Sequence, residues 1–245
     1  MDRPDLTGRT ALVTGSAKGL GSDCIEALAS AGADVVVHYH TSEEEATALA
    51  DALSAQFGVS SLAVGADVTE PDEVDALFST IEAERGPVDL LVNNVGRFAP
   101  EDWETMDWDV WKNVLETNFN ATCLCSKRAL QTMRDAEYGR IVNIGYAGAE
   151  KGLVNPTNFP YFVAKTGVLM FTRMLAADTQ HEGITVNAVS PYVIENSDAF
   201  PDTLPRGRAA TTEDVIDPIL FFMGGPEYIS GENVEVDGGW LPESV

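Results

Sequence analysis

The stretch Ala11-Leu-Val-Thr-Gly-Ser-Ala-Lys-Gly-Leu-Gly21 decides the fold of this chain. Its first three residues are apolar and predict a buried strand, and apolar residues at helical spacing follow the glycines as far as Ala31. The spacing Gly15-x-x-x-Gly19-x-Gly21 lets the backbone turn tightly and lets a pyrophosphate come close. A helix that begins at such a turn presents backbone N–H groups and the positive end of its dipole to an anion. The stretch therefore predicts a strand–turn–helix unit that binds a nucleotide phosphate.

Strands and helices alternate along the rest of the chain. Short apolar runs predict strands at 11–13, 33–40, 61–66, 88–93, 139–145, 184–189 and 231–239. Helical patterns separate these runs, and they include a helix that Ser42 and Glu45 would begin with a capping box and a long helix from Trp108 to Met133. This alternation predicts an α/β fold with a doubly wound parallel sheet and right-handed crossovers, in one domain over residues 1–245.

Composition narrows the class of protein. The chain has 245 residues, of which 44% are hydrophobic and 22% are charged, and this fits one domain with a large core. It contains no run of about 18 apolar residues that would cross a membrane. The polar start at Met1 carries no apolar signal region, so we expect a cytoplasmic protein. Three cysteines without a matching ligand cluster predict neither a disulfide framework nor a metal site.

The net charge of the chain is strongly negative. Asp and Glu number 39 against 15 Lys and Arg, which gives a formal net charge of −24. Such a charge argues against nucleic acid and anionic membranes as partners. It also repels itself at low salt and is better tolerated where salt screens it, which favours a halophilic host over an acidic mesophilic protein.

Polar residues gather where the predicted strands end, at the edge where ligands of such sheets bind. They are His38, His40, Thr41 and Ser42 after the second strand, Asp67 after the third, and Asn94 and Gly96 after the fourth. An acidic residue after the second strand would bind ribose hydroxyls and repel a 2′-phosphate, and Val37-His-Tyr-His-Thr41 contains none. Lys18 adds a positive charge in the glycine-rich turn. We therefore predict NADP(H) as the cofactor, with NAD(H) as the alternative.

The pair Tyr161-x-x-x-Lys165 lies one helical turn apart, so both side chains share a face. An ammonium group beside a phenol favours the phenolate, and it is expected to lower the pKa of Tyr161 toward neutral pH. Such a tyrosine can give a proton to a carbonyl oxygen while a hydride reaches the carbonyl carbon.

Over nearly its whole length the chain resembles the short-chain dehydrogenase/reductases. The matching motifs, in order, are Thr14-Gly-Ser-Ala-Lys-Gly-Leu-Gly21, Asp67, Asn93-Asn-Val-Gly96, Asn118, Tyr161-x-x-x-Lys165, Pro191 and Val236-Asp-Gly-Gly239. The resemblance implies a Rossmann-type sheet of about seven strands and a homodimer or homotetramer. It also implies that Tyr161 is the acid, that Lys165 holds the nicotinamide ribose, and that Asn118 positions a water in a proton relay to Lys165.

Together the motifs and the resemblance predict the residues that contact the cofactor. Asp67 and Val68 would meet the adenine, and Pro191 and Val193 would border the nicotinamide. The full set is Gly15, Ser16, Lys18, Gly19, Leu20, Gly21, His38, His40, Thr41, Ser42, Asp67, Val68, Asn94, Val95, Gly96, Tyr161, Lys165, Pro191 and Val193.

Two features depart from the family pattern. The family has a serine after the fifth strand that hydrogen-bonds the substrate carbonyl, but in Asn143-Ile-Gly-Tyr-Ala-Gly148 the residue in its place is Tyr146. A tyrosine hydroxyl can also donate, so Tyr146 is a candidate catalytic residue. Thr157 or Asn158 could supply the donor instead, or the position could be lost and the activity weak. The substrate loop, residues 192–210, looks shorter than the lid usual in the family.

These observations favour an NADP(H)-dependent oxidoreductase that acts on a small carbonyl or alcohol, such as a 3-oxoacyl-type ketone. The body of the chain is similar to 3-oxoacyl-acyl-carrier-protein reductases, and the Val37–Ala46 segment and Lys18 turn are similar to pteridine reductases, which also replace the serine. A pterin-type reductase is therefore an alternative, as is a nucleotide-binding protein with weak or no catalysis.

Overall fold

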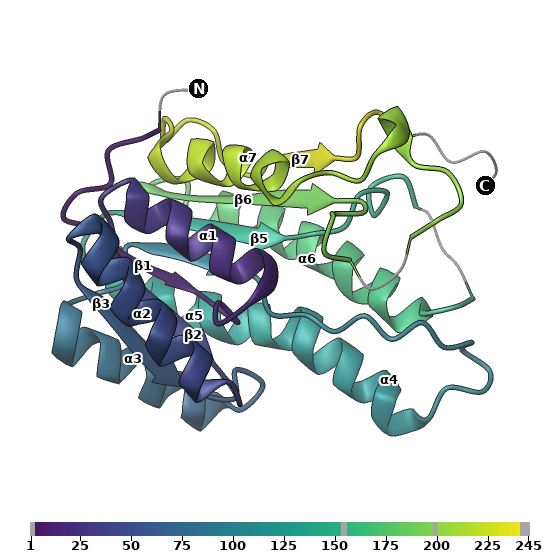
Figure 1. Cartoon of the computed structure of the whole chain (residues 1–245), viewed down its shortest axis with the longest axis horizontal. Coiled ribbons are helices and arrows are strands. Elements are labelled where there is room, and N and C mark those ends of the chain that lie inside the picture. Colours follow the sequence, from purple (N-terminus) through teal and green to yellow (C-terminus); the bar gives the residue numbers. More distant parts are fainter. Residues whose placement is uncertain (1–2, 153–155, 198–199, 241–245) are drawn as a thin grey trace.

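The computed structural model describes residues 3–152, 156–197 and 200–240. Seven strands form one parallel sheet in the order β3-β2-β1-β4-β5-β6-β7 (Figure 1). Their bounds are β1 (Thr10–Val13), β2 (Asp34–Tyr39), β3 (Ser61–Gly65), β4 (Leu90–Asn93), β5 (Gly139–Ile144), β6 (Ile184–Pro191) and β7 (Asn233–Val236). The predicted doubly wound α/β fold is confirmed.

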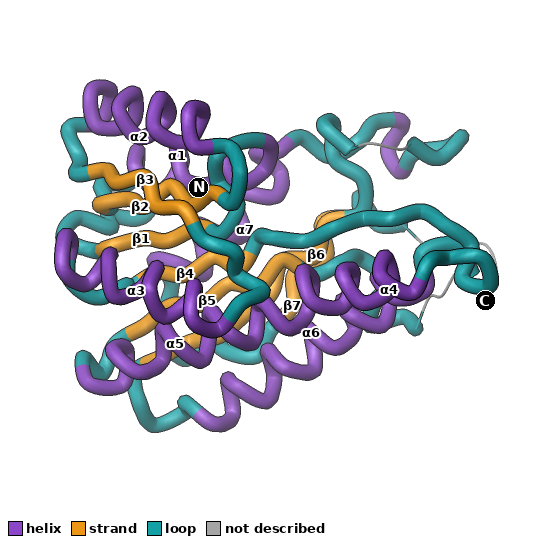
Figure 2. Tube along the Cα trace, turned by 90° about the horizontal axis from the view of Figure 1, so that it is seen from below, coloured by secondary structure: helices purple, strands orange, loops and turns teal. Residues whose placement is uncertain are grey.

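Helices cover both faces of the sheet, as Figure 2 shows, with α1, α2 and α7 on one side and α3, α5 and α6 on the other. Their bounds are α1 (Gly19–Ser30), α2 (Glu43–Phe57), α3 (Pro71–Arg85), α4 (Trp108–Leu115), α5 (Ala121–Asp135), α6 (Phe159–Asp178) and α7 (Thr212–Gly224). Within the described ranges, no helix is long and apolar enough to cross a membrane.

The central strand β1 is buried on both faces because helices pack on both. Ala11 and Val13 pack with Ile25 and Leu28 of α1, while Leu12 faces Phe78 of α3. Strands covered on both sides read as continuous apolar runs rather than alternating ones. This is why the short apolar run at residues 11–13 indicates a strand inside the sheet and not one at its edge.

The structure corrects one helix prediction and adds detail to another. The predicted capping box at Ser42 and Glu45 is wrong: Ser42 precedes α2, but its side chain makes no capping bond. Its backbone has ψ 58° instead of the extended conformation typical of a capping residue. The helical stretch predicted from Trp108 to Met133 is confirmed; it is made of α4, a π-helical turn η1 (Glu116–Asn120) and α5. A capping box that was not predicted begins α7, where Thr211 and Asp214 bond reciprocally.

A buried polar network joins the ends of two central strands to the helices beneath them. Asn93 of β4 donates from Nδ2 to the Ser126 hydroxyl at 2.9 Å and to Asn143 Oδ1 at 2.8 Å. Asn143 of β5 donates in turn to the Thr172 hydroxyl of α6 at 2.9 Å. Buried amides are stabilising only when they are satisfied in this way. The network fixes β5 immediately before the segment that carries Tyr146.

Removing the central member of this network should be costly. We expect Asn143→Ala to lower the free energy of unfolding by about 2–4 kcal/mol, because two hydrogen bonds are lost and partner groups stay buried. Urea denaturation measures the change. The matched control is Asn113→Ala, which removes an exposed partner of Arg97 and should change stability by less than about 0.5 kcal/mol. Equal effects of the two substitutions would contradict the assignment.

Candidate active site

The glycine-rich turn joins β1 to α1 in a space that admits no side chain. Gly15 and Gly19 have φ of 65° and 61°, which glycine adopts without strain. A Cβ at Gly21 would lie 2.4 Å from the Gly15 carbonyl oxygen and 2.8 Å from Asn94 Nδ2. Asn94 itself donates from Nδ2 to the Thr14 carbonyl oxygen at 2.9 Å. The turn is therefore packed tightly against the end of β4, with the N-terminus of α1 at the same edge.

His38 holds the glycine-rich turn from the side of β2. Its ring Nδ1 accepts from the Gly15 N–H at 2.9 Å, so its Nε2 carries the proton and faces the Ala66 carbonyl oxygen at 3.0 Å. Its backbone exchanges two further bonds of 2.9 Å with Ser16. Burial lowers the pKa of His38 to about 4, which keeps the ring neutral. The structure thus gives His38, predicted as a cofactor contact, a part in shaping the turn.

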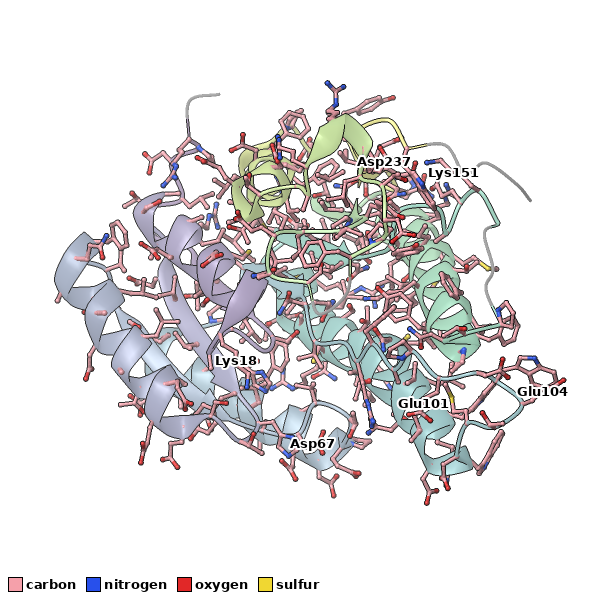
Figure 3. The ribbon with its side chains drawn as sticks, turned by 45° about the vertical axis from the view of Figure 1, so that its right-hand side comes forward. Lys18, Asp67, Glu101, Glu104, Lys151 and Asp237 are labelled. Atoms are coloured by element: carbon pink, nitrogen blue, oxygen red, sulfur yellow. The ribbon has the colours of Figure 1, made fainter. Side chains whose placement is uncertain are left out.

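The other residues predicted from the strand ends lie along the same edge. Lys18 and His40 are exposed, and Figure 3 labels Lys18 and Asp67 on the turns that follow β1 and β3. Asp67 accepts from the backbone N–H and hydroxyl of Thr69 at 2.9 and 2.7 Å, and its carboxylate lies 3.8 Å from His40 Nε2. Burial acts to raise the pKa of Asp67, but these bonds outweigh it and the pKa is lowered. Lys18 adds an exposed cation at this edge, and residues 37–41 at the end of β2 include no acidic side chain.

A cavity of about 520 Å³ opens next to this edge. It brings together residues from α1, η1, β5, α6 and β6 and from the segment that follows β4. Among the predicted site residues, its lining includes Leu20, Asn94, Gly96, Asn118, Tyr146, Tyr161, Lys165, Pro191 and Val193. Ser16, Lys18, His38, His40, Thr41, Ser42, Asp67, Val68, Val95 and the three turn glycines are not part of the lining. The four candidate catalytic residues therefore share one cavity.

Lys165 is buried and Tyr161 is half-buried, and desolvation decides the protonation of both. Lys165 Nζ donates to the Ile144 carbonyl oxygen at 2.7 Å and lies 5.7 Å from the centre of the Tyr161 ring. Burial lowers the pKa of Lys165 to about 8 and, with Tyr146 nearby, raises the pKa of Tyr161. The expectation that Lys165 lowers the pKa of Tyr161 is therefore wrong, since desolvation of the phenol dominates. A protonated phenol is the form that can donate to a carbonyl oxygen.

Asn118 lies in η1 and faces Lys165 across Gly96. Its Nδ2 donates to the carbonyl oxygens of Arg97 and Val114, both at 2.9 Å. Its buried Oδ1 has no protein partner within the described residues. A Cβ at Gly96 would lie 2.5 Å from Asn118 Oδ1 and 3.5 Å from Lys165 Nζ. An unused acceptor and an ammonium group thus lie close to the same glycine, as a proton relay requires.

Tyr146 lies at the cavity with its ring against Tyr161. Their ring centres are 5.7 Å apart at an interplanar angle of 70°. Burial, with Tyr192 nearby, raises the pKa of Tyr146 to about 12, so its hydroxyl keeps its proton and can donate. Of the two alternative donors, Thr157 also lines the cavity, whereas Asn158 is buried outside the lining.

Sequence reasoning missed the aromatic character of the cavity. Phe98, Phe162, Tyr192 and Phe200 line it. Phe162 and Tyr192 directly follow the predicted residues Tyr161 and Pro191, but adjacency does not show which side chains point into a cavity. The substrate loop supplies Phe200, and its ends are joined where Ala210 N–H bonds the Val193 carbonyl oxygen at 2.9 Å.

Comparisons with known proteins agree with this geometry. Residues 15–241 match the family model described as enoyl-(acyl carrier protein) reductase. A 3-oxoacyl-acyl-carrier-protein reductase of Synechocystis sp. is 36% identical over 245 residues, covering 96% of this chain and 98% of that protein. The 3-oxoacyl-acyl-carrier-protein reductase FabG of Escherichia coli is 33% identical over 246 residues, covering 96% and 98%. The crystal structure of a gluconate 5-dehydrogenase from Burkholderia cenocepacia, in complex with NADP and tartrate, has a TM-score of 0.89 and 30% identity and covers 97% of both chains.

The buried neutral state of His38 predicts a pH dependence of stability. The unfolded chain takes up a proton at His38 near pH 6.5, while the folded chain resists it down to about pH 4. The contribution of neutral His38 to the free energy of unfolding is therefore complete above pH 6.5 and is lost as the pH falls from 6.5 toward 4. Between about pH 7 and pH 4.5 we expect it to cost roughly 2–3 kcal/mol of unfolding free energy.

Urea denaturation of the wild type and of His38→Gln isolates this contribution, since glutamine does not titrate. The variant should lose correspondingly less stability between the two pH values. His181→Gln, a substitution of a histidine on the surface, is the control and should retain the wild-type slope. A His38→Gln slope equal to that of the wild type would show that His38 does not titrate in this window.

Proposed function

This chain belongs to the short-chain dehydrogenase/reductase family, and we propose that it is an NADP(H)-dependent oxidoreductase that transfers a hydride between the cofactor and a small ketone or alcohol. The observation that carries the proposal is the meeting of Tyr161, Lys165 and Asn118 in one cavity beside a glycine-rich turn. Their residue types and their places at the carboxyl ends of parallel strands fit an acid, its cationic partner and a relay acceptor.

Two features of the chain fit a dinucleotide. Glycine is required at Gly21 and Gly96, because a Cβ there would lie 2.4 Å from the Gly15 carbonyl oxygen or 2.5 Å from Asn118 Oδ1, and so the turns beside the cavity stay closely packed. The turn that begins α1 offers backbone N–H groups for phosphates. The Lys18 ammonium and the lack of a carboxylate after β2 favour a 2′-phosphate, and the gluconate 5-dehydrogenase relative is in complex with NADP. When bound, the cofactor would supply or accept the hydride.

The protein side chains supply the proton. The Tyr161 phenol donates to the carbonyl oxygen as the carbonyl carbon gains a hydride, so a ketone becomes an alcohol. The Lys165 ammonium, with a pKa of about 8, is charged at neutral pH and stabilises the phenolate left behind. Asn118 Oδ1 accepts a hydrogen bond in the relay that returns the proton. The Tyr146 hydroxyl orients the carbonyl oxygen in place of the family serine.

The names of the relatives suggest substrates without fixing one. The curated relatives are named as reductases of 3-oxoacyl groups on an acyl carrier protein, so a 3-oxoacyl-type ketone is one candidate substrate. Reduction of a ketone and oxidation of an alcohol are the two directions of the same EC 1.1.1-type activity. We also propose a cytoplasmic homodimer or homotetramer. The oligomer is supported by three apolar side chains that are 46–67% exposed at helical spacing on α6: Val163, Met170 and Met174.

A nucleotide-binding protein without turnover is the second candidate function. Tyr146 at the serine position favours it, because a larger side chain fills part of the space where the carbonyl would be oriented. The complete set of Tyr161, Lys165 and Asn118 favours catalysis, since binding alone needs none of their proton chemistry.

Replacing the acid separates these two functions. We expect Tyr161→Phe to lower kcat for small ketones by about 100-fold or more, because only the donated proton is removed. The dissociation constant for NADPH should stay within about threefold. Tyr228→Phe, at a fully exposed tyrosine, is the control and should keep both values. An unchanged kcat would contradict the role of Tyr161, and NADPH binding without turnover of any ketone would favour the second candidate.

Cofactor choice is testable at Lys18. We expect Lys18→Ala to weaken NADPH binding about fivefold and NADH binding by less than about twofold, because the 2′-phosphate alone distinguishes the two. Nicotinamide fluorescence titrations measure the affinities for NADPH and NADH. Titrations at low salt and in about 2 M KCl also test the halophilic expectation, under which NADPH binding is retained or strengthened in KCl.

The matched control is Lys112→Ala, which removes the same charge from a lysine paired with Asp109 on α4 and should leave both affinities unchanged. Tighter binding of NADH than of NADPH by the wild type would overturn the cofactor proposal. Loss of NADPH binding in molar KCl would overturn the halophilic one.

A further inference from the structure

The candidate active site has a wall of aromatic rings that the proposed chemistry does not require. We use the name aromatic wall for five residues that surround the acid Tyr161 in the cavity lining: Phe98, Tyr146, Phe162, Tyr192 and Phe200. Phe98 and Phe200 are 47% and 53% exposed although both are large and apolar. Large apolar side chains left exposed at the mouth of a cavity mark a surface that binds an apolar group.

Several rings of the aromatic wall contact one another or Tyr161: Phe162 meets Tyr146 edge to face, and Tyr192 is tilted against Tyr146. The Tyr146 ring centre lies 5.5 Å from that of Phe162 and 6.4 Å from that of Tyr192. On another side of Tyr161, the Phe98 ring centre is 5.2 Å away at an interplanar angle of 86°. Aromatic rings attract further rings in offset or edge-on arrangements. The wall thus surrounds the proton-donating phenol with surfaces suited to a flat ring.

The same cavity lacks charges that could bind an anionic substrate. Lys165 is the single charged side chain in the described lining, and its Nζ is bonded to the Ile144 carbonyl oxygen. The sequence has no lysine or arginine between Arg173 and Arg206, a range that includes most of the substrate loop. A carboxylate buried here without a cation would lose its hydration and gain little.

Trp240, itself bonded to Lys151, packs against the ring of Tyr192. The Tyr192 ring stacks on Trp240 with centres 4.2 Å apart and planes 14° apart. Lys151 Nζ donates to the Trp240 carbonyl oxygen at 3.3 Å and to the Asp237 carboxylate at 2.9 Å (Figure 3). Because its position is fixed in advance, Tyr192 offers a rigid surface that costs little entropy to bind against.

We propose that the substrate of this site is an uncharged, flat ketone with an aromatic or unsaturated ring next to its carbonyl group, and that Tyr146 and Tyr192 determine this specificity. The inference rests on the proposed oxidoreductase function. In the reaction, a hydride from NADPH forms the new C–H bond at the carbonyl carbon. The carbonyl oxygen takes the proton of Tyr161, the ketone is reduced to an alcohol, and NADPH is oxidised to NADP⁺. A sugar acid or a linear acyl chain would use little of the aromatic wall.

Two matched pairs of ketones test the substrate class with the wild-type protein and NADPH. Acetophenone and 2-octanone each contain eight carbons, but only the first has a ring, and conjugation makes its carbonyl intrinsically less reactive. We expect kcat/KM for acetophenone to exceed that for 2-octanone by about tenfold or more. 4-Methylacetophenone has a methyl group where 4-acetylbenzoate has a carboxylate. We expect kcat/KM for 4-methylacetophenone to be about 100-fold higher than for 4-acetylbenzoate.

Equal or reversed values in either pair would overturn the inference, even though turnover itself would support the proposed function. If no ketone is turned over, calorimetric titration of the four compounds into the protein with NADP⁺ gives their order of affinity. That order must match the predicted one for the inference to stand. Absence of NADPH binding would instead overturn the proposed function.

Substitutions in the aromatic wall assign the preference to named rings. Tyr192→Leu should reduce the acetophenone to 2-octanone ratio at least fivefold, while Tyr192→Phe should keep it, because the ring matters and the hydroxyl does not. Tyr146→Phe should keep the ratio but lower kcat for both ketones. Tyr228→Leu, at an exposed tyrosine outside the cavity, should leave the ratio unchanged. If Tyr192→Leu does not fold, Phe162→Leu takes its place. A folded leucine variant of either ring with the wild-type ratio would overturn the role of the aromatic wall.

Discussion

The close packing of the turns that end β1 and β4 is the constraint on which the rest of the site depends. The Thr14 hydroxyl accepts from the backbone N–H groups of Asn94 and Val95, and the Asn94 side chain donates back to the Thr14 carbonyl oxygen. These bonds exist only because β1 and β4, which are far apart in the sequence, are neighbours in the sheet. The packing also requires glycine at position 21, where a Cβ would lie 2.4 Å from the Gly15 carbonyl oxygen and 2.8 Å from Asn94 Nδ2.

Burial has opposite effects on the two groups that move the proton. It disfavours the charged form of each, so it raises the pKa of Tyr161 and lowers that of Lys165. The phenol therefore keeps its proton at neutral pH, and the Lys165 ammonium group is a stronger acid than that of a surface lysine. The unused acceptor Asn118 Oδ1 lies near Lys165 across Gly96. One physical effect, desolvation, thus keeps the phenol protonated and makes the ammonium group a readier proton donor, as the proposed chemistry needs.

The surface and the cavity of this protein have contrasting chemistry. Acidic residues exceed basic ones by 24 over the chain, yet the described cavity lining contains no carboxylate. The acidic groups are spread over the exposed helices, where water and salt screen them. The cavity is aromatic and nearly uncharged, which is the basis of the substrate class proposed above.

The sequence by itself determined the alternation of strands and helices, the glycine-rich turn and the Tyr161–Lys165 pair. These features are local, because strand periodicity, glycine spacing and one helical turn are all encoded within a few residues. Only the tertiary structure decided that His38 supports the turn, that burial raises the pKa of Tyr161, and that an aromatic wall faces it. Each of these depends on contacts between segments far apart in the chain, such as Gly15 with His38 or Tyr192 with Trp240. Desolvation and ring packing are set by what surrounds a residue in space, and no spacing along the sequence reports that.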